Sequence, residues 1–140
     1  MDNNYRITII GEQEVDGSSD KVEVITEGNY KKGTDHYYIG YKEYDADDPN
    51  LFYDNLIKVE EKLVTIRRKG EIFSQLMLEK NRRHQCLYQT PMGDLMIGVF
   101  TKTLDNRLGE HGGTLEVSYT LDFNGDLASE NRFFIKVEEK

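Results

Sequence analysis

The chain has 140 residues, with 18 Lys+Arg against 26 Asp+Glu and a formal net charge of −8. This length predicts one domain over residues 1–140, and 37% hydrophobic with 31% charged residues excludes a disordered chain and a membrane protein. The negative charge disfavours nucleic-acid binding, and the single cysteine, Cys86, excludes an intrachain disulfide framework.

Most of the chain alternates apolar and polar residues with a period of two, which is typical of half-buried antiparallel strands. The clearest run holds Leu115, Val117, Tyr119, Leu121 and Phe123 on one face. In chain order, the alternation and the turn residues between the runs predict strands over residues 4–14, 21–31, 36–45, 54–60, 63–69, 72–80, 84–90, 94–104, 114–123 and 131–138.

Turn residues separate these runs at 32–35, 68–71, 91–94 and 124–126, and residues 106–113 are predicted to form a polar loop ending in two glycines. The segment after Asp45 is compatible with two structures. Asp48 and Pro49 can open a helix, whereas residues 56–59 read equally well as a strand. We therefore predict a loop or a single helical turn over 46–53, followed by a strand.

The number and spacing of the strands predict an all-β fold. We expect a single closed antiparallel β-barrel of about eight to ten strands, because closure removes the exposed sheet edges that many short strands would otherwise leave. A two-layer β-sandwich is the main alternative. A closed barrel of this size either fills with side chains or encloses a small ligand.

Several short motifs occur in a characteristic order: Tyr41-Lys42-Glu43, Arg68-Lys69-Gly70, the run from Tyr88 to Gly93, Thr101-Lys102-Thr103, Tyr119 and Asn131. In this order the chain resembles the YwiB-like family of small bacterial proteins, a domain of unknown function grouped with the calycin-like, lipocalin-type β-barrels. The resemblance covers nearly the whole chain, from about Gly28 onward most closely, and departs from the family around residues 45–55. It implies a calycin-like barrel, a bacterial origin and a cytoplasmic location, and no reaction.

Glu43 and Arg68 are the most informative charges. Each shares a strand face with apolar residues, so both are expected to point into the barrel near one end, where a buried charge needs a partner. They form either a ligand-binding pair or a structural ion pair. Strand tyrosines and threonines can line a lumen or simply pack in the core. The predicted ligand-binding residues are Tyr30, Tyr41, Glu43, Arg68, Tyr88, Thr90, Thr101 and Tyr119.

No cofactor or metal is predicted. His84 and Cys86 share a strand face, but a zinc site normally has at least three protein ligands. The acidic loop at Asp45, Asp47 and Asp48 lacks the glycine and the final glutamate of a calcium loop. The residues at 1–10 show no signal peptide and no apolar run is long enough for a membrane span, so neither a membrane nor a nucleic-acid partner is expected.

Three functional hypotheses remain. The first is a non-enzymatic barrel, with a small, partly apolar or anionic ligand in its lumen. The second is a homodimeric interaction module without a ligand, because Leu95, Ile97 and Val99 lie on one strand face and Met96, Phe100 and Leu104 on the other. The third is an enzyme, for which a nucleophile or acid–base pair would have to come from Glu43, His84, Cys86 and His111.

Overall fold

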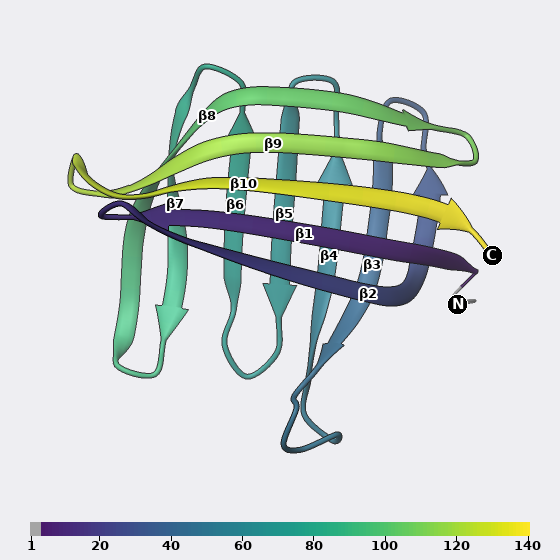
Figure 1. Cartoon of the computed structure of the whole chain (residues 1–140), viewed down its shortest axis with the longest axis horizontal. Coiled ribbons are helices and arrows are strands. Elements are labelled where there is room, and N and C mark those ends of the chain that lie inside the picture. The colour runs from purple at the N-terminus through teal and green to yellow at the C-terminus, as the bar shows by residue number, and fades with distance from the viewer. Residues whose placement is uncertain (1–3) are drawn as a thin grey trace.

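The computed structural model describes residues 4–140, which form ten antiparallel strands and no helix (Figure 1). The strands are β1 (Tyr5–Val15), β2 (Ser18–Lys32), β3 (Tyr37–Tyr44), β4 (Phe52–Val59), β5 (Leu63–Lys69), β6 (Ser74–Glu79), β7 (Arg83–Thr90), β8 (Gly93–Gly109), β9 (Gly112–Phe123) and β10 (Asp126–Glu139). They close in the order β1-β10-β9-β8-β7-β6-β5-β4-β3-β2. The predicted all-β closed barrel is therefore confirmed. Residues 1–3 of the predicted domain lie outside the described chain.

The barrel is flattened into two layers whose strands cross steeply (Figure 1). The front layer contains β1, β9, β10, the first part of β2 and the last part of β8, and the back layer contains β3 to β7. β2 passes between the layers at Gly28, where a Cβ atom would overlap the carbonyl oxygen of Gly40 and the side chain of Ile7. β8 passes between them at a bulge between Thr101 and Thr103. Glycine and a bulge thus provide the two bends that closure requires.

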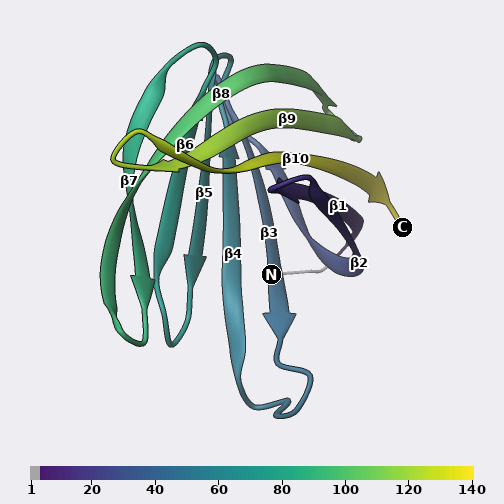
Figure 2. The same cartoon turned by 60° about the vertical axis from the view of Figure 1, so that its left-hand side comes forward.

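Apolar side chains fill the space between the layers. Fully buried members include Ile7, Ile39, Ile57, Leu115 and Ile135, which come from both layers. The strands of the back layer extend below the front layer in Figure 1, and Figure 2 shows the same strands projecting past the β1–β2 hairpin. The inner face of the back layer is therefore covered at one end and uncovered at the other. We call these the covered end and the open end.

Several element boundaries differ from the predicted ones. The predicted polar loop over 106–113 is wrong, since β8 continues to Gly109 and turns directly into β9. The bulge after Thr101 shifts the apolar alternation by one position, so that Leu104 packs against the core instead of lying on the outer face. The segment before β4 is a loop, the helical alternative at Asp48 is not formed, and β4 begins at Phe52.

Two tight turns also lengthen the neighbouring strands beyond the prediction. β2 begins at Ser18 and β10 at Asp126, because each follows a two-residue turn with positive φ angles. The φ angles are 50° at Asp16 and 82° at Gly17 in the first turn, and 53° at Asn124 and 92° at Gly125 in the second. These are the backbone angles of a type I′ hairpin turn, which needs two residues only.

The ladder between β6 and β7 is the sparsest in the described barrel. Its register contains one pair, Ser74 with Tyr88, whereas the other neighbouring strands pair over longer stretches. Further along this seam the Met77 amide donates to the Cys86 sulfur at 3.3 Å instead of to a backbone carbonyl. One ladder pair, a backbone hydrogen bond of 3.2 Å from the Gln89 amide to the Phe73 carbonyl and side-chain contacts close the barrel here.

No helix among residues 4–140 meets the length and apolarity required to cross a membrane.

Candidate functional site

A row of polar side chains crosses the inner face of the back layer at its open end. The strand registers place Tyr41 opposite Asn55, Asn55 opposite Arg68, Arg68 opposite Ser74 and Ser74 opposite Tyr88. Directly paired residues of antiparallel strands point to the same face. The row lies next to an apolar row formed by Ile39, Ile57, Ile66 and Leu76. We call the five residues Tyr41, Asn55, Arg68, Ser74 and Tyr88 the polar row; it marks the boundary between core and solvent.

Arg68 is the central charge of the polar row. Its guanidinium carbon lies 4.0 Å from the ring centroid of Tyr53, and its Nη2 donates to Oε2 of Glu43 at 3.3 Å. Gly70 leaves room for the Tyr53 ring, which a Cβ atom at that position would meet. The Nε–H of Arg68 is buried and has no hydrogen-bond partner within the described chain. The Arg68 side chain is therefore held by stacking and by one long ion-pair contact, and its other N–H donors have no hydrogen-bond partner among the described residues.

The partners of Glu43 confirm that it faces the same site. Its second carboxylate oxygen accepts a hydrogen bond of 3.4 Å from the amide of Asn55, which is 6% exposed. Burial, reinforced by the charge of Glu43 and opposed by that of Arg68, raises the pKa of Tyr41 to about 12. The Tyr41 hydroxyl therefore stays protonated at neutral pH and is available as a hydrogen-bond donor, not as a base.

A small cavity of about 230 Å³ lies beside Arg68. It is lined by Tyr53, Arg68, Ile72, Ser74, Tyr88, Gln89, Thr90 and Pro91. The Thr90 hydroxyl donates to the carbonyl of Gly93 at 2.6 Å and accepts from the amide of Met92 at 3.2 Å, so it stabilises the β7–β8 turn that forms one wall. Arg68, Tyr88 and Thr90, three of the predicted ligand-binding residues, thus share one cavity. Glu43 is connected to it by the contact with Arg68, and Tyr41 lies further along the polar row.

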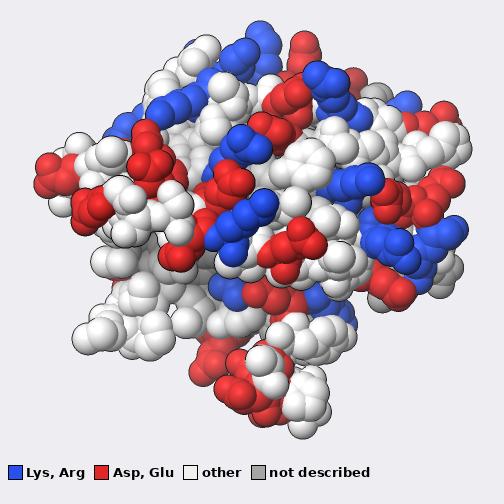
Figure 3. Space-filling model, in the orientation of Figure 1, with Lys and Arg blue, Asp and Glu red and all other residues white. Residues whose placement is uncertain are grey.

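Apolar side chains continue from this cavity along the uncovered inner face. Leu95 pairs with Tyr88, and the two are 42% and 41% exposed although both point inward. Across the opening, Val22 and Val24 share the inner face of the β1–β2 hairpin with Ile9. Figure 3 shows charged side chains of both signs over the front layer and a hollowed, mostly uncharged region below that hairpin. The open end therefore combines the guanidinium of Arg68 with surrounding apolar side chains.

Two predicted ligand-binding residues lie in the core, away from the open end. Tyr30 is 8% exposed, its hydroxyl donates to the carbonyl of Gly109 at 2.6 Å, and its ring stacks on Tyr37 at a centroid distance of 5.7 Å. Burial raises its pKa above the ordinary tyrosine value. Thr101 is fully buried at the bulge of β8, and its hydroxyl has no partner within the described residues. The structure does not bring either residue into contact with the polar row.

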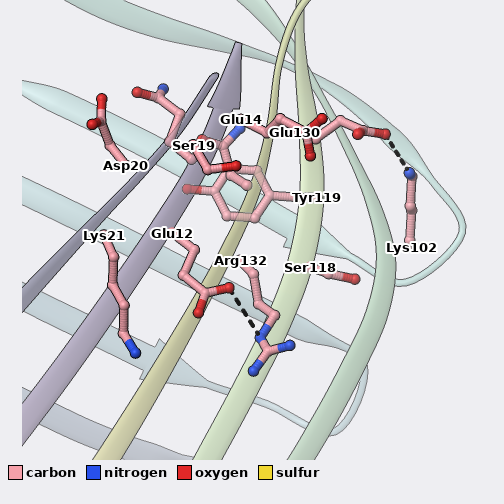
Figure 4. Close-up of a pocket in the computed structure, with 12 residues that line it drawn as sticks. Glu12, Glu14, Ser19, Asp20, Lys21, Lys102, Ser118, Tyr119, Glu130 and Arg132 are labelled. Atoms are coloured by element: carbon pink, nitrogen blue, oxygen red, sulfur yellow. Dashed lines mark hydrogen bonds and ion pairs between the residues drawn. The ribbon is translucent and has the colours of Figure 1, made fainter. Parts of the chain in front are cut away.

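Tyr119 lies at a third position, on β9 near the tip of the β1–β2 hairpin (Figure 4). It contributes to a wider, more open cavity of about 520 Å³ that also includes Glu12, Glu14, Asp20 and Glu130. Two cations of this cavity are already paired, Lys102 with Glu130 at 3.1 Å and Arg132 with Glu116 at 3.5 Å. Burial raises the pKa of Tyr119 to about 12. Acidic groups predominate there, so this cavity offers less to an anion than the one at Arg68.

The four residues considered for catalysis do not form a pair with one another. His84 Nε2 lies 2.8 Å from Glu79 Oε1, and His111 Nδ1 lies 2.9 Å from Glu139 Oε1. Burial raises the pKa of the Cys86 thiol, which keeps it protonated. No group of three or more His, Cys, Asp or Glu side chains in the described chain is arranged to hold a metal ion.

Three residues of the open end were missed from the sequence. Tyr53 and Ser74 belong to none of the motifs, and Asn55 lies at the end of the segment where the chain departs from the family pattern. The common signal is the register of β3 to β6, which puts Asn55 and Ser74 in the polar row and Tyr53 opposite Glu43. That register follows from strand pairing, which the alternation of a single strand does not contain.

Comparisons with known proteins are consistent with this fold. A family model described as "Domain of unknown function (DUF1934)" matches residues 7–135. The crystal structure of ywiB protein from Bacillus subtilis is similar to this chain, with a TM-score of 0.85 and 20% sequence identity over 97% of this chain and 91% of that chain. No curated protein matches the chain in sequence.

Proposed function

The chain belongs to the DUF1934 family, a domain of unknown function, and from the geometry of its open end we propose that it binds a small, partly apolar anion beside Arg68. The anionic group contacts the guanidinium, and the apolar part lies along Tyr88 and Leu95. This is a binding function and involves no covalent step.

The observation that carries the proposal is the incomplete pairing of Arg68. An arginine offers five N–H donors, and an arginine built for structure usually meets a carboxylate through two parallel hydrogen bonds. Arg68 has one contact of 3.3 Å to Glu43 and a buried Nε–H without a partner. Stacking on Tyr53 fixes the plane of the guanidinium and leaves its edge free. Because the Nε–H is buried, a bound anion would accept hydrogen bonds from the Nη donors that the protein leaves unpaired.

The size of the site limits the ligand. The cavity holds about 230 Å³, which is below the ~300–1,000 Å³ typical of drug-sized ligands. The enclosed part of the ligand is therefore small, of the order of one carboxylate, sulfonate or phosphate group and the atoms next to it. A larger apolar portion has room along the uncovered inner face, where Tyr88 and Leu95 are exposed.

The first test uses 8-anilinonaphthalene-1-sulfonate, which joins an anionic group to apolar rings and fluoresces when it leaves water. We expect the parent protein to bind it saturably and the Arg68→Gln variant to bind about tenfold or more weakly, because a charge-assisted hydrogen bond contributes about 1.5–3 kcal/mol. Arg67→Gln is the matched control, since Arg67 neighbours Arg68 in the chain but faces outward on β5.

The Glu43→Gln variant gives the opposite expected result. Removing this carboxylate frees the Arg68 guanidinium and removes a repulsive charge, so the dissociation constant should fall. Binding to the parent should also weaken as salt is added. The proposal is contradicted if the Arg68→Gln and Arg67→Gln variants bind equally well, or if the parent does not bind the probe.

A further inference from the structure

A second feature of the molecule, independent of the anion site, is the unpaired edge of β2. This strand pairs with β1 from Ser18 to Gly28, but with β3 only from Gly28 to Lys32. Along residues 20–27 its other edge has no strand partner in the described structure. Figures 1 and 2 show this part of β2 as the lower margin of the front layer, above the projecting strands of the back layer. An unpaired edge presents free backbone donors and acceptors to another strand.

The β1–β2 turn determines which amides are free. Val15 and Ser18 flank the two-residue turn Asp16-Gly17, so their backbone groups bond to each other. Because the direction of the backbone groups alternates along a strand, the odd-numbered residues of this edge point their N–H and C=O groups outward. Three such residues in the middle of the edge are Lys21, Glu23 and Ile25.

The side chains of the edge are not a uniform row of like charges. On the outer face, one rung runs from Arg132 through Glu12 to Lys21, and another runs from Glu138 through Arg6 to Glu27. In both rungs the sign alternates from strand to strand up to the free edge. The first rung ends on a cation and the second on an anion, six positions apart along β2. Glu27 also contacts the Lys140 amine at 3.1 Å.

We propose that this edge accepts an extended segment of a partner protein, which adds to β2 as an antiparallel strand. The segment carries an acidic residue opposite Lys21 and a basic residue opposite Glu27, which continues both charge rungs. Between them, small apolar residues on its other face pack against Val22 and Val24, which are 62% and 37% exposed on the inner side. Backbone hydrogen bonds provide affinity, and the two charges set the direction and register.

The occupant is a single strand and not a second barrel. The back layer projects past the free edge, as Figure 2 shows, so a twofold pairing of two β2 edges would bring two such projections into the same region. A lone extended strand occupies only the width of one strand, about 5 Å.

β2 itself has the required pattern, so the probe is a fluorescent synthetic peptide that copies residues 18–28. Paired antiparallel about Val24, its Glu27 lies opposite Lys21 and its Lys21 opposite Glu27. We expect saturable binding by fluorescence anisotropy. The Lys21→Glu protein should bind about tenfold more weakly, because an attractive pair becomes a repulsive one. A peptide with its own Glu27→Lys should restore binding to that variant. Lys31→Glu, on the part of β2 that pairs with β3, is the control.

The Glu23→Pro variant tests the backbone contribution. Its N–H points outward, so proline leaves the β1–β2 ladder intact but removes a donor from the free edge. We expect an unchanged circular dichroism spectrum and no measurable peptide binding. The proposal is overturned if the peptide does not bind the parent, if charge reversal has no effect, or if the compensating peptide fails to restore binding. Sedimentation of the parent as a dimer through this edge, lost in Glu23→Pro, would also overturn it by showing that a second copy is the occupant.

Discussion

The two ends of the barrel interior use the same residue types for different purposes. At the covered end, Tyr30 is buried, stacked on Tyr37 and bonded to the Gly109 carbonyl. At the open end, Tyr88 points to the same inner face but remains 41% exposed, next to an arginine with spare donors. The strands that carry these residues are similar. The difference arises because the front layer covers one end of the back layer and not the other.

Two arginine–carboxylate pairs repeat this contrast. Arg83 donates to both oxygens of Asp122, at 3.0 Å and 2.6 Å. The pair lies over Gly98, where the Cβ atom of any other residue would overlap both side chains. Arg68 meets Glu43 through one contact of 3.3 Å. The first pair is complete and joins β7 to β9 across β8, whereas the second leaves its arginine available.

The largest expected effect tests the covering of the inner face. Ile39→Ala removes a fully buried side chain at the covered side of the polar row and should lower the free energy of unfolding by about 4 kcal/mol. Leu95→Ala, on the same inner face at the open end, should lower it by less than about 1 kcal/mol, because this side chain is already 42% exposed. Urea denaturation measures both. Equal losses would show that the open end is packed as tightly as the core.

A smaller effect compares two tyrosine hydroxyls. Tyr30→Phe leaves the Gly109 carbonyl without its donor and should cost about 1–2 kcal/mol of stability. Tyr88→Phe removes the hydroxyl of a tyrosine that is 41% exposed, and should be neutral in the same denaturation experiment. If Tyr88→Phe were as destabilising as Tyr30→Phe, the open end would have to be regarded as a structural site.

The smallest effect concerns pH. The hydrogen bonds from Arg83 hold the pKa of Asp122 below its ordinary value, so this pair stabilises the fold above the unfolded-state pKa of about 4 and stops doing so as the pH falls through the lower, folded-state pKa. Asp122→Asn should therefore reduce the denaturation midpoint at pH 7, and its difference from the parent should shrink towards pH 2. Glu43→Gln, with one long contact, should change the midpoint less at every pH. The opposite ranking would mean that Arg68 is the structural arginine.

The barrel itself could be predicted because alternation is a local property of the sequence. All ten strands appear in the predicted order. The errors occur where alternation is interrupted. The bulge after Thr101 moves Leu104 to the inner face, and the polar residues that follow were predicted to form a loop although β8 continues to Gly109. In the same way, the register shift between Leu127 and Ser129 interrupts the alternation just after a two-residue turn, so the start of β10 was not predicted.

The site was harder to predict because it depends on pairing between strands. Glu43 and Arg68 stood out as charges on apolar faces, and the structure brings them together. Asn55 and Ser74 become part of the site only through the registers that align them with Arg68. Tyr30 and Thr101 were equally reasonable candidates by sequence. Their burial follows from the crossing of the two layers, which no single strand encodes.

With a single ladder pair, the seam between β6 and β7 has the fewest paired residues of any two neighbouring strands in the described barrel. A closed sheet separates most easily between the two strands that share the fewest hydrogen bonds, and here these strands carry Ser74 and Tyr88. Because few backbone hydrogen bonds hold β6 to β7, we expect the wall of the barrel to open at this seam, next to Arg68, before it opens elsewhere.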